Sequence, residues 1–337
     1  MKWDASQFCD ISNISGIRIG QEQNNKALTG CTVIIAEDGA VGGVDQRGGS
    51  PGTRETDLLR PMHMVENIHA VLLTGGSAFG LNAATGVMKY LEENKIGFNT
   101  GVIPVPIVPA AVLFDLAIGD PSIRPDLQMG YQACINASTE SPMQGNYGAG
   151  CGATVGKIFG MLSAMKSGIG QAALEISSGV FVGAIVAVNA FGDVVDPSSG
   201  DILAGARPVQ KGPLKLGGKN KFANTLDVLR TFTGQTIMKF ASSQNTTIGA
   251  VITNARLTKE EANKVAQMAQ NGLALTINPA HTMMDGDTLF TMATGKKKID
   301  VNIIGAFAPI VVAQAIINAV TFALPEAGLP AYTNLIS

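Results

Sequence analysis

Thr246 has a setting in which a threonine hydroxyl could act as a nucleophile. It opens an apolar stretch directly after a long segment rich in glycine, proline and lysine. A threonine hydroxyl is a weak nucleophile and needs an adjacent base, which an N-terminal threonine supplies as its own free α-amine. That amine would exist here only if the bond between Asn245 and Thr246 were broken, through attack of the hydroxyl on the preceding carbonyl. Because a threonine that opens a strand is common, the hypothesis depends on its surroundings.

A second stretch, His281-Thr-Met-Met-Asp-Gly-Asp-Thr288, carries two carboxylates around a glycine. Gly286 permits a tight turn, and carboxylates as close as Asp285 and Asp287 interact and can orient an amine or tune its pKa. A calcium loop would require the pattern D-x-[DN]-x-[DN]-G with a later glutamate, which is missing. We therefore expect no metal, with a solvated turn as the alternative. His281 is the histidine most worth attention, although each histidine is taken as structural.

Two glycine-rich stretches resemble nucleotide-binding loops without matching them. In Gly148–Lys157, Cys151 stands where a phosphate loop needs its first glycine, and Ile158 follows the lysine. In Gly75–Gly80, Ser77 replaces the second glycine of a dinucleotide fingerprint. We therefore expect no cofactor. Lys157 remains a candidate for an active-site wall, and the backbone N–H groups of Gly76 and Ser77 could line a pocket.

Asn189 follows a buried-looking strand in Val188-Asn-Ala-Phe-Gly192. A turn asparagine is the ordinary interpretation of this position. The alternative is an amide that donates a hydrogen bond to an oxyanion.

Composition limits the classes of function. The chain has 337 residues, of which 46% are hydrophobic and 15% charged, with a net charge of −2. A global disordered state is excluded, and without a basic excess we expect no nucleic-acid partner. The scattered cysteines predict free thiols rather than a zinc site. The N-terminal residues do not have the form of a signal peptide, so we expect a cytoplasmic protein.

The elements that must position these residues follow from the apolar patterns. Buried strands are predicted at 32–36, 70–74, 180–188, 248–253, 289–293 and 301–304, with a hairpin return at 193–196. Helices are predicted at 81–93 and at 257–275, the second opened by a capping box of Thr258 and Glu261. The apolar run 307–324 predicts a buried helix rather than a membrane span, because Gln314 and Asn318 interrupt it. Residues 205–245 predict a long surface loop with one helix near 226–232.

Together and in this order, the stretches resemble the L-aminopeptidase/D-esterase family of N-terminal-nucleophile hydrolases and its nylon-oligomer hydrolase branch. The similarity runs from about residue 30 to the C-terminus, and the matching stretches are Thr29–Val33, Val44–Gly49, Thr74–Leu81, Gly148–Lys157, Asn189, Asn245–Ile248 and Asp285–Phe290. The resemblance implies an α/β fold, a four-layer αββα sandwich shared with ornithine acetyltransferases, in a single domain of residues 1–337. It also implies self-cleavage into an α chain of residues 1–245 and a β chain of residues 246–337, assembled as tetramers of αβ units.

The resemblance further implies a role for each site residue. Thr246 would be the nucleophile and amine base, Asp285 and Asp287 would orient that amine, Lys157 would lie beside the hydroxyl, and Asn189 would help to bind the oxyanion. Aminopeptidase members typically have a serine nucleophile and a Ser-Gly-Glu turn, so the threonine and the Asp-Gly-Asp turn are similar to the nylon-oligomer branch.

One departure concerns Phe114, where the family often has a tyrosine before an aspartate. The hydrogen bond of that phenol is lost here, and losing one donor near an oxyanion can cost about 10²-fold in rate. Phe114 is therefore a pocket candidate together with Gly76 and Ser77.

Three functions remain open at this point. The first is an amide hydrolase that acts on short peptides or 6-aminohexanoate oligomers. The second is an acyltransferase of the ornithine type, in which an amine replaces water as the acceptor. The third is a binding protein in which Thr246 and the paired aspartates are incidental.

Overall fold

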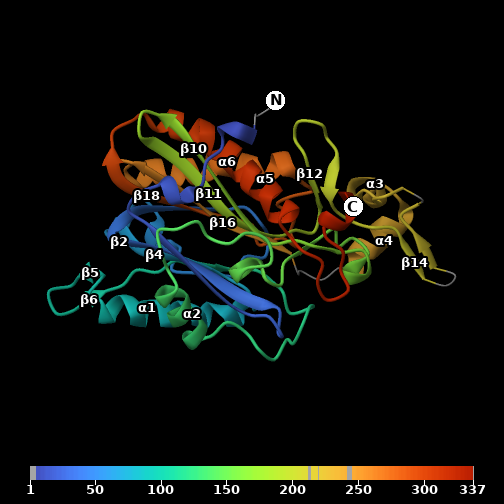
Figure 1. Cartoon of the computed structure of the whole chain (residues 1–337), viewed down its shortest axis with the longest axis horizontal. Coiled ribbons are helices and arrows are strands. Elements are labelled where there is room, and N and C mark those ends of the chain that lie inside the picture. Colours follow the sequence, from blue (N-terminus) through green and yellow to red (C-terminus); the bar gives the residue numbers. More distant parts are fainter. Residues whose placement is uncertain (1–4, 212–213, 219, 241–244, 337) are drawn as a thin grey trace.

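The computed structural model describes residues 5–211, 214–218, 220–240 and 245–336, and a mixed sheet dominates it (Figure 1). Among the described residues nine strands form this sheet, with β1 (Arg18–Asn24) paired to β2. The order of the other strands is β10 (Ile169–Ser177), β11 (Val180–Asn189), β16 (Thr246–Ala255), β18 (Thr288–Lys297), β2 (Thr29–Gln46), β4 (Asn67–Thr74), β7 (Ala110–Val112) and β3 (Thr53–Arg54). The mixed α/β class is therefore confirmed, and so are the predicted strands at 32–36, 70–74, 180–188, 248–253 and 289–293.

Strand β16 lies inside the sheet and is buried along its whole length. It runs antiparallel to β11, with Thr246 opposite Asn189, and parallel to β18, with Ile248 opposite Thr288. The C-terminal end of β11 and the N-terminal ends of β16 and β18 therefore meet at one edge. This edge carries the candidate residues.

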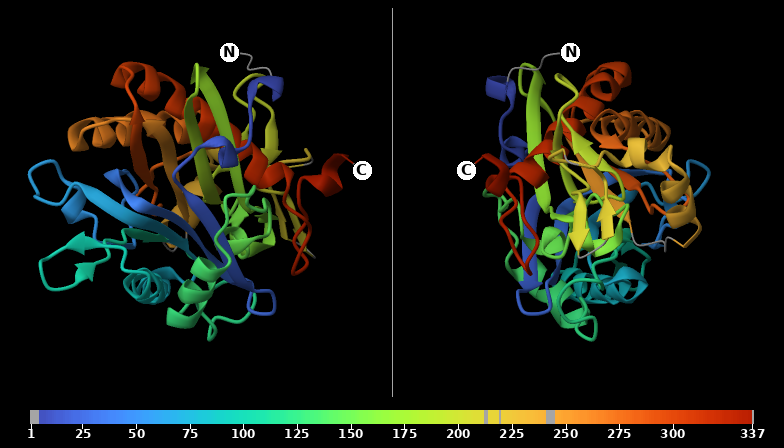
Figure 2. Two further views of the ribbon diagram at one scale, coloured as in Figure 1. Left: turned by 60° about the vertical axis from the view of Figure 1, so that its left-hand side comes forward. Right: turned by 90° about the vertical axis from the view of Figure 1, so that its right-hand side faces the viewer.

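Helices cover the two outer faces. α5 (Lys259–Thr276) and α6 (Val301–Thr321) pack on the half of the sheet that contains β10, β11 and β18, whereas α1 (Ala83–Glu93) and α2 (Leu127–Ile135) pack beside β2 and β4 (Figures 1 and 2). A further apolar cluster joins the two halves of the sheet through residues such as Ile34, Ile68, Ile248 and Phe290. The two β layers are thus halves of one hydrogen-bonded sheet that is continuous through β2.

The predicted capping box begins α5. The Glu261 carboxylate accepts from the Thr258 N–H at 2.8 Å, and the Thr258 hydroxyl accepts from the Glu261 N–H at 3.3 Å. The stripe of Ala262, Val265 and its helical neighbours is buried, as expected for an amphipathic helix.

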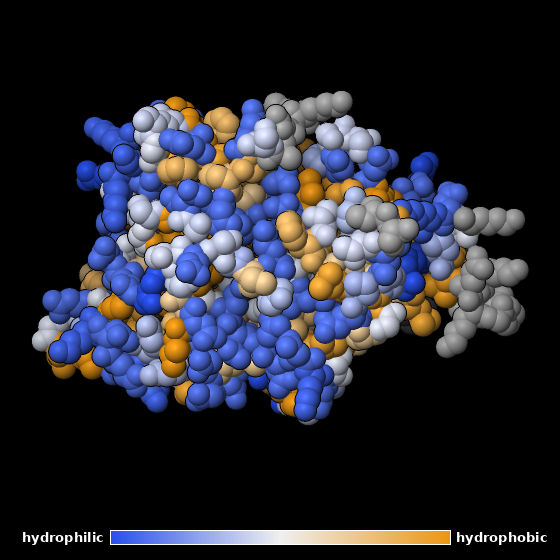
Figure 3. Space-filling view, viewed as in Figure 1, coloured by the Kyte–Doolittle hydropathy of each residue, from blue (hydrophilic) through white to orange (hydrophobic). Residues whose placement is uncertain are grey.

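The strand predicted at 301–304 is wrong, because these residues form the first turn of α6. The Asp300 carboxylate caps this helix by accepting from the Asn302 N–H at 2.7 Å. α6 is long and apolar enough to cross a membrane by composition, but 56% of its most apolar window is buried, and it packs against β10, β11 and α5. On the face shown in Figure 3, apolar side chains are scattered among hydrophilic ones, which is normal for a protein surface.

The segment before Thr246 is more ordered than the predicted loop. It contains β14 (Val209–Lys211), β15 (Leu214–Leu216), α3 (Thr225–Leu229) and α4 (Phe232–Phe240). The buried Asp193 carboxylate holds it to the body by accepting from the N–H groups of Ala206 at 2.7 Å and Thr225 at 2.6 Å. Asp193 lies in β12 (Asp193–Val195), which pairs with β13 (Ile202–Ala204) and β17 (Ile277–Asn278). The predicted hairpin return on β11 is therefore wrong.

Candidate active site

Thr246 is the first residue of β16 and is buried. Its hydroxyl donates a hydrogen bond to the carbonyl oxygen of Asn245, the residue whose bond to Thr246 is the predicted cleavage site. The candidate nucleophile and the carbonyl that it would attack are thus already in contact in the uncut chain. An intramolecular acyl shift requires the hydroxyl oxygen to reach the carbonyl carbon of this same group, so the contact holds the two reacting groups together without itself being the attack geometry.

The Asp285–Asp287 turn lies against this same bond. The Gly286 N–H donates to the Asn245 carbonyl oxygen at 3.0 Å. A Cβ atom at Gly286 would lie 2.8 Å from the Thr246 hydroxyl oxygen. The sequence suggested that this glycine permits a tight turn, but here it is also required by the space that the Thr246 hydroxyl occupies.

We expect Gly286→Ala to slow self-cleavage by about 10²-fold. The added methyl group would displace the Thr246 hydroxyl by up to about 1 Å from its position beside the Asn245 carbonyl. The fraction of cut chain over time, measured by denaturing gel electrophoresis, checks this. Gly295→Ala in β18 is the control for the general cost of replacing a glycine: its φ of +75° strains the backbone of the variant, but a Cβ atom there meets nothing within 4 Å. Equal cleavage rates in the two variants would contradict the steric argument.

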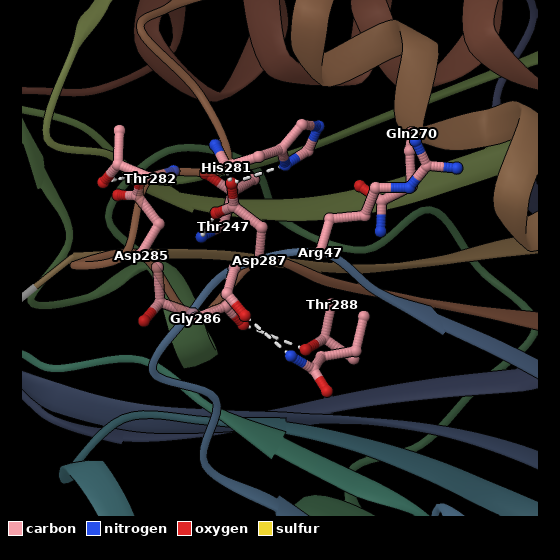
Figure 4. Close-up of polar contacts among 12 residues, drawn as sticks. Arg47, Thr247, Gln270, His281, Thr282, Asp285, Gly286, Asp287 and Thr288 are labelled. Atoms are coloured by element: carbon pink, nitrogen blue, oxygen red, sulfur yellow. Dashed lines mark hydrogen bonds and ion pairs between the residues drawn. The ribbon is translucent and has the colours of Figure 1, made fainter.

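The Asp287 carboxylate binds backbone N–H groups of two segments, the start of β16 and the residues before the turn (Figure 4). Its carboxylate accepts from the Thr247 N–H at 2.8 Å and from the His281 N–H at 3.0 Å. The Nδ1 atom of His281 lies 3.0 Å from the same carboxylate. Asp287 therefore fixes the residue after the nucleophile, and His281 belongs to the site.

Asp285 is equally buried but has different partners. Its carboxylate accepts from the Thr282 N–H at 2.8 Å and from the Thr282 hydroxyl at 2.6 Å. Burial, reinforced by the negative charge of Asp287, raises the pKa of Asp285 to about 6. Its carbonyl oxygen accepts from the Ser50 N–H at 2.8 Å. Sequence reasoning missed Thr282 and Ser50, because neither stands in a motif of its own.

Lys157 and Asn189 form the other side of the site. The Lys157 ammonium donates to the backbone oxygen of Asn189 at 2.9 Å and to its side-chain oxygen at 2.8 Å. Burial lowers the pKa of Lys157 to about 7, against the opposing negative charges of Asp285 and Asp115. The Asn189 amide N–H donates to the Phe114 carbonyl at 2.8 Å. Since Asn189 is opposite Thr246 on the neighbouring strand, the structure brings these predicted residues together.

The remaining pocket candidates have separate positions. Phe114 lines a small cavity beside Lys157. The Gly76 N–H donates to the Asp115 carboxylate at 2.7 Å, and the Ser77 N–H donates to the Leu113 carbonyl at 2.9 Å. These two N–H groups thus hold the protein's own chain, and neither residue lines that cavity. Sequence reasoning missed Asp115 as a member of the site.

Within the described ranges, no group of three or more histidine, cysteine, aspartate or glutamate side chains is arranged to hold a metal ion. The four cysteines are free thiols; Cys31, Cys134 and Cys151 are buried and Cys9 is half-buried.

Comparison with known proteins identifies the family and a related fold. Residues 10–332 match the model of peptidase family S58. A protein of Mycobacterium leprae described as an uncharacterised aminopeptidase is 38% identical over 98% of this chain and 95% of its own length. A 6-aminohexanoate-oligomer endohydrolase of Kocuria sp. is 30% identical over 90% of this chain and 84% of its own length.

The fold has a solved counterpart in the L-aminopeptidase D-Ala-esterase/amidase of Ochrobactrum anthropi, described as a variant of the Ntn-hydrolase fold. The TM-score is 0.66 at 15% identity, over 93% of this chain and 86% of that one. The matches to the family and to its aminopeptidase and endohydrolase relatives support amide hydrolysis as the activity, and the chain belongs to peptidase family S58.

Proposed function

We propose that this protein cuts itself between Asn245 and Thr246 and then uses the freed Thr246 to hydrolyse amide bonds. The observation that carries the proposal is the double contact at the Asn245 carbonyl oxygen. The Thr246 hydroxyl reaches that oxygen from one side, and the Gly286 N–H donates to it at 3.0 Å.

Self-cleavage begins when the Thr246 hydroxyl oxygen attacks the Asn245 carbonyl carbon and loses its proton. The negative charge that develops on the carbonyl oxygen is stabilised by the Gly286 N–H. The C–N bond then breaks, its nitrogen takes up a proton and becomes the α-amine of Thr246, and Asn245 is left as an ester on the hydroxyl. Water hydrolyses the ester and releases the Asn245 carboxylate.

Lys157 and Asp285 are suited to move these protons. The pKa of Lys157 is about 7 and that of Asp285 about 6, so both groups change protonation near neutral pH. General acid–base catalysis is most effective when the pKa lies near the working pH.

The processed enzyme repeats the same steps on a substrate. The Thr246 amine takes the proton from the hydroxyl as that oxygen attacks the substrate carbonyl. The carbonyl oxygen occupies the position of the former Asn245 oxygen, beside the Gly286 N–H. The amine product leaves with a proton, and water hydrolyses the acyl ester.

The substrates that we propose are short peptides and 6-aminohexanoate oligomers, supported by the names of the relatives. The mass of the purified protein is first measured by mass spectrometry under denaturing conditions. A single uncut chain that still hydrolyses amides would overturn the mechanism. The cut protein is then assayed on peptide amides, β-peptides and 6-aminohexanoate oligomers side by side. Release of free amine with water as the only acceptor identifies a hydrolase, whereas faster transfer to an added amine identifies an acyltransferase.

The charge of Asp285 predicts how activity depends on pH. As pH falls through about 6, Asp285 takes up a proton and no longer stabilises the positive charge that the Thr246 amine gains when it accepts the hydroxyl proton, so kcat/KM should fall on the acid side. Asp285→Asn should remove the ionisation near pH 6 from this limb, leave the ionisation of the Thr246 amine, and lower the rate near neutrality by about 10²-fold. Rates between pH 4.5 and 8 on one substrate check this, and an unchanged acid limb in the variant would assign the ionisation elsewhere.

Phe114→Tyr adds an O–H donor in the cavity beside Lys157. We expect kcat on amide substrates to rise by about 10-fold or more, because an added donor near the oxyanion lowers the barrier. Phe114→Leu is the control, since it removes the ring without adding a donor. If the two variants have the same kcat, the position acts through shape alone.

A further inference from the structure

Asp115 is a buried carboxylate that the mechanism above does not use. Its side chain is 3% exposed, and it accepts from the Thr29 hydroxyl at 2.6 Å and from the Gly76 N–H at 2.7 Å. In the part of the chain that the structure describes, no cation lies within ion-pair distance of it. Burying a charge without a counter-ion is expensive. A carboxylate in such a position is a candidate for a functional role.

The chain makes room for this carboxylate at two glycines. A Cβ atom at Gly75 would lie 2.0 Å from a carboxylate oxygen of Asp115, and one at Gly152 would lie 2.6 Å from its Cβ atom. Gly152 belongs to the stretch that ends at Lys157. Asp115 is therefore packed between the two glycine-rich stretches.

Asp115 and Lys157 line the same small cavity, together with Thr154 and apolar side chains such as Phe114 and Met161. Apart from Asp115, Thr154 and Lys157, the side chains that line this cavity are apolar, so the attraction between the carboxylate and the ammonium is screened less than at a surface. Asp285 is the other carboxylate whose charge acts on Lys157. Two buried carboxylates thus act on the Lys157 ammonium, and one of them, Asp115, lines the same cavity.

Lys166 is a second buried lysine on which the charge of Asp115 acts. The Lys166 ammonium donates to the carbonyl oxygens of Gly150 at 3.3 Å, Ala153 at 3.1 Å and Ser167 at 2.8 Å. Burial lowers the pKa of Lys166 to about 8, and the charges of Cys151, Glu326 and Asp115 oppose this. The negative charge of Asp115 therefore acts on two buried ammonium groups, those of Lys157 and Lys166.

We propose that Asp115 is a positioning residue whose buried negative charge keeps Lys157 protonated beside the nucleophile, across the cavity that the two share. The inference rests on the proposed function only because that function gives Lys157 its role in the cleavage reaction. The electrostatic link itself is independent of any amide hydrolysis.

The test is the titration of Lys157 followed by NMR of ¹³Cε-labelled lysine. The protein is Thr246→Ala, which keeps the chain uncut, and Lys157→Met in that background assigns the signal. Asp115→Asn retains an oxygen that can accept from the Gly76 N–H but removes the charge. We expect the Lys157 midpoint to fall by about one pH unit.

Thr29→Val is the matched control, because it removes one hydrogen bond of the same carboxyl group but not the group itself. Its Lys157 midpoint should stay within about 0.3 pH unit of the parent. An unchanged midpoint in Asp115→Asn, or an equal shift in both variants, would overturn the proposal.

A reciprocal measurement keeps the proposal testable if Asp115→Asn does not fold. Coupled sites shift each other, so Lys157→Met should raise the midpoint of the Asp115 carboxyl, followed by ¹³Cγ, by about one pH unit. No change would overturn the link. If wild-type protein neither cuts itself nor hydrolyses amides but these titrations respond as expected, the proposed function fails and the Asp115 link stands.

Discussion

Thr246→Ala should remain a single uncut chain and lose at least about 10⁴-fold in amide hydrolysis. The variant has no hydroxyl to attack the Asn245 carbonyl, so the α-amine never forms. Nucleophile and base are lost together, which explains why the expected effect is the largest of any single change. Intact mass under denaturing conditions and initial rates on the best substrate measure the two losses.

Thr247→Val is the control for this experiment. The Thr247 hydroxyl is buried and has no hydrogen-bond partner among the described residues. Valine has nearly the same shape, so its introduction removes an unsatisfied hydroxyl and should leave both cleavage and stability essentially intact. Cleavage in Thr246→Ala, or its loss in Thr247→Val, would place the nucleophile elsewhere.

Lys157→Met should lower both self-cleavage and hydrolysis by about 10²- to 10³-fold. The ammonium donates to two oxygens of Asn189, which lies opposite Thr246 on the neighbouring strand. Methionine keeps the length of the side chain but neither its charge nor its donors. Single-turnover cleavage and steady-state kcat measure the two rates separately.

Lys259→Met separates catalysis from the general cost of removing a buried lysine. Like Lys157, Lys259 donates to two oxygens, the carbonyls of His63 at 2.8 Å and Val65 at 2.7 Å, but it lies at the start of α5. It should lower thermal stability and leave kcat close to wild type. A comparable loss of kcat in both lysine variants would point to folding rather than chemistry at Lys157.

The parts of the fold that could be predicted from the sequence have strong local patterns. α5 has both a capping box and an apolar stripe, and β11 and β16 are apolar runs of strand length. Residues 301–304 have a similar apolar run, and only the capping Asp300 and the packing of α6 show that they are helical. Local periodicity cannot decide such short runs, because helices and buried strands share them.

Partners distant in sequence could not be predicted. The strand at Asp193 pairs with residues more than eighty positions later, and Asp193 itself orders the segment before the cleavage site. The same limit applies to the site. Thr246 and the Asp-Gly-Asp turn could be proposed from their motifs and a family resemblance, whereas Asp115 and Thr282 act through contacts that only the folded chain creates.

The position of β16 has a consequence for the two chains after a cut. β16 is hydrogen-bonded to β11, which precedes the cut, and β18 is hydrogen-bonded to β2, which also precedes it. The two fragments are therefore interleaved within one sheet and can separate only by melting it. The molecule would fold in one piece but denature into two, so that refolding depends on protein concentration while folding of the newly made chain does not. Thermal unfolding would then be irreversible at low protein concentration. The half-life of the mature enzyme would depend on the rate of unfolding rather than on the free energy of unfolding.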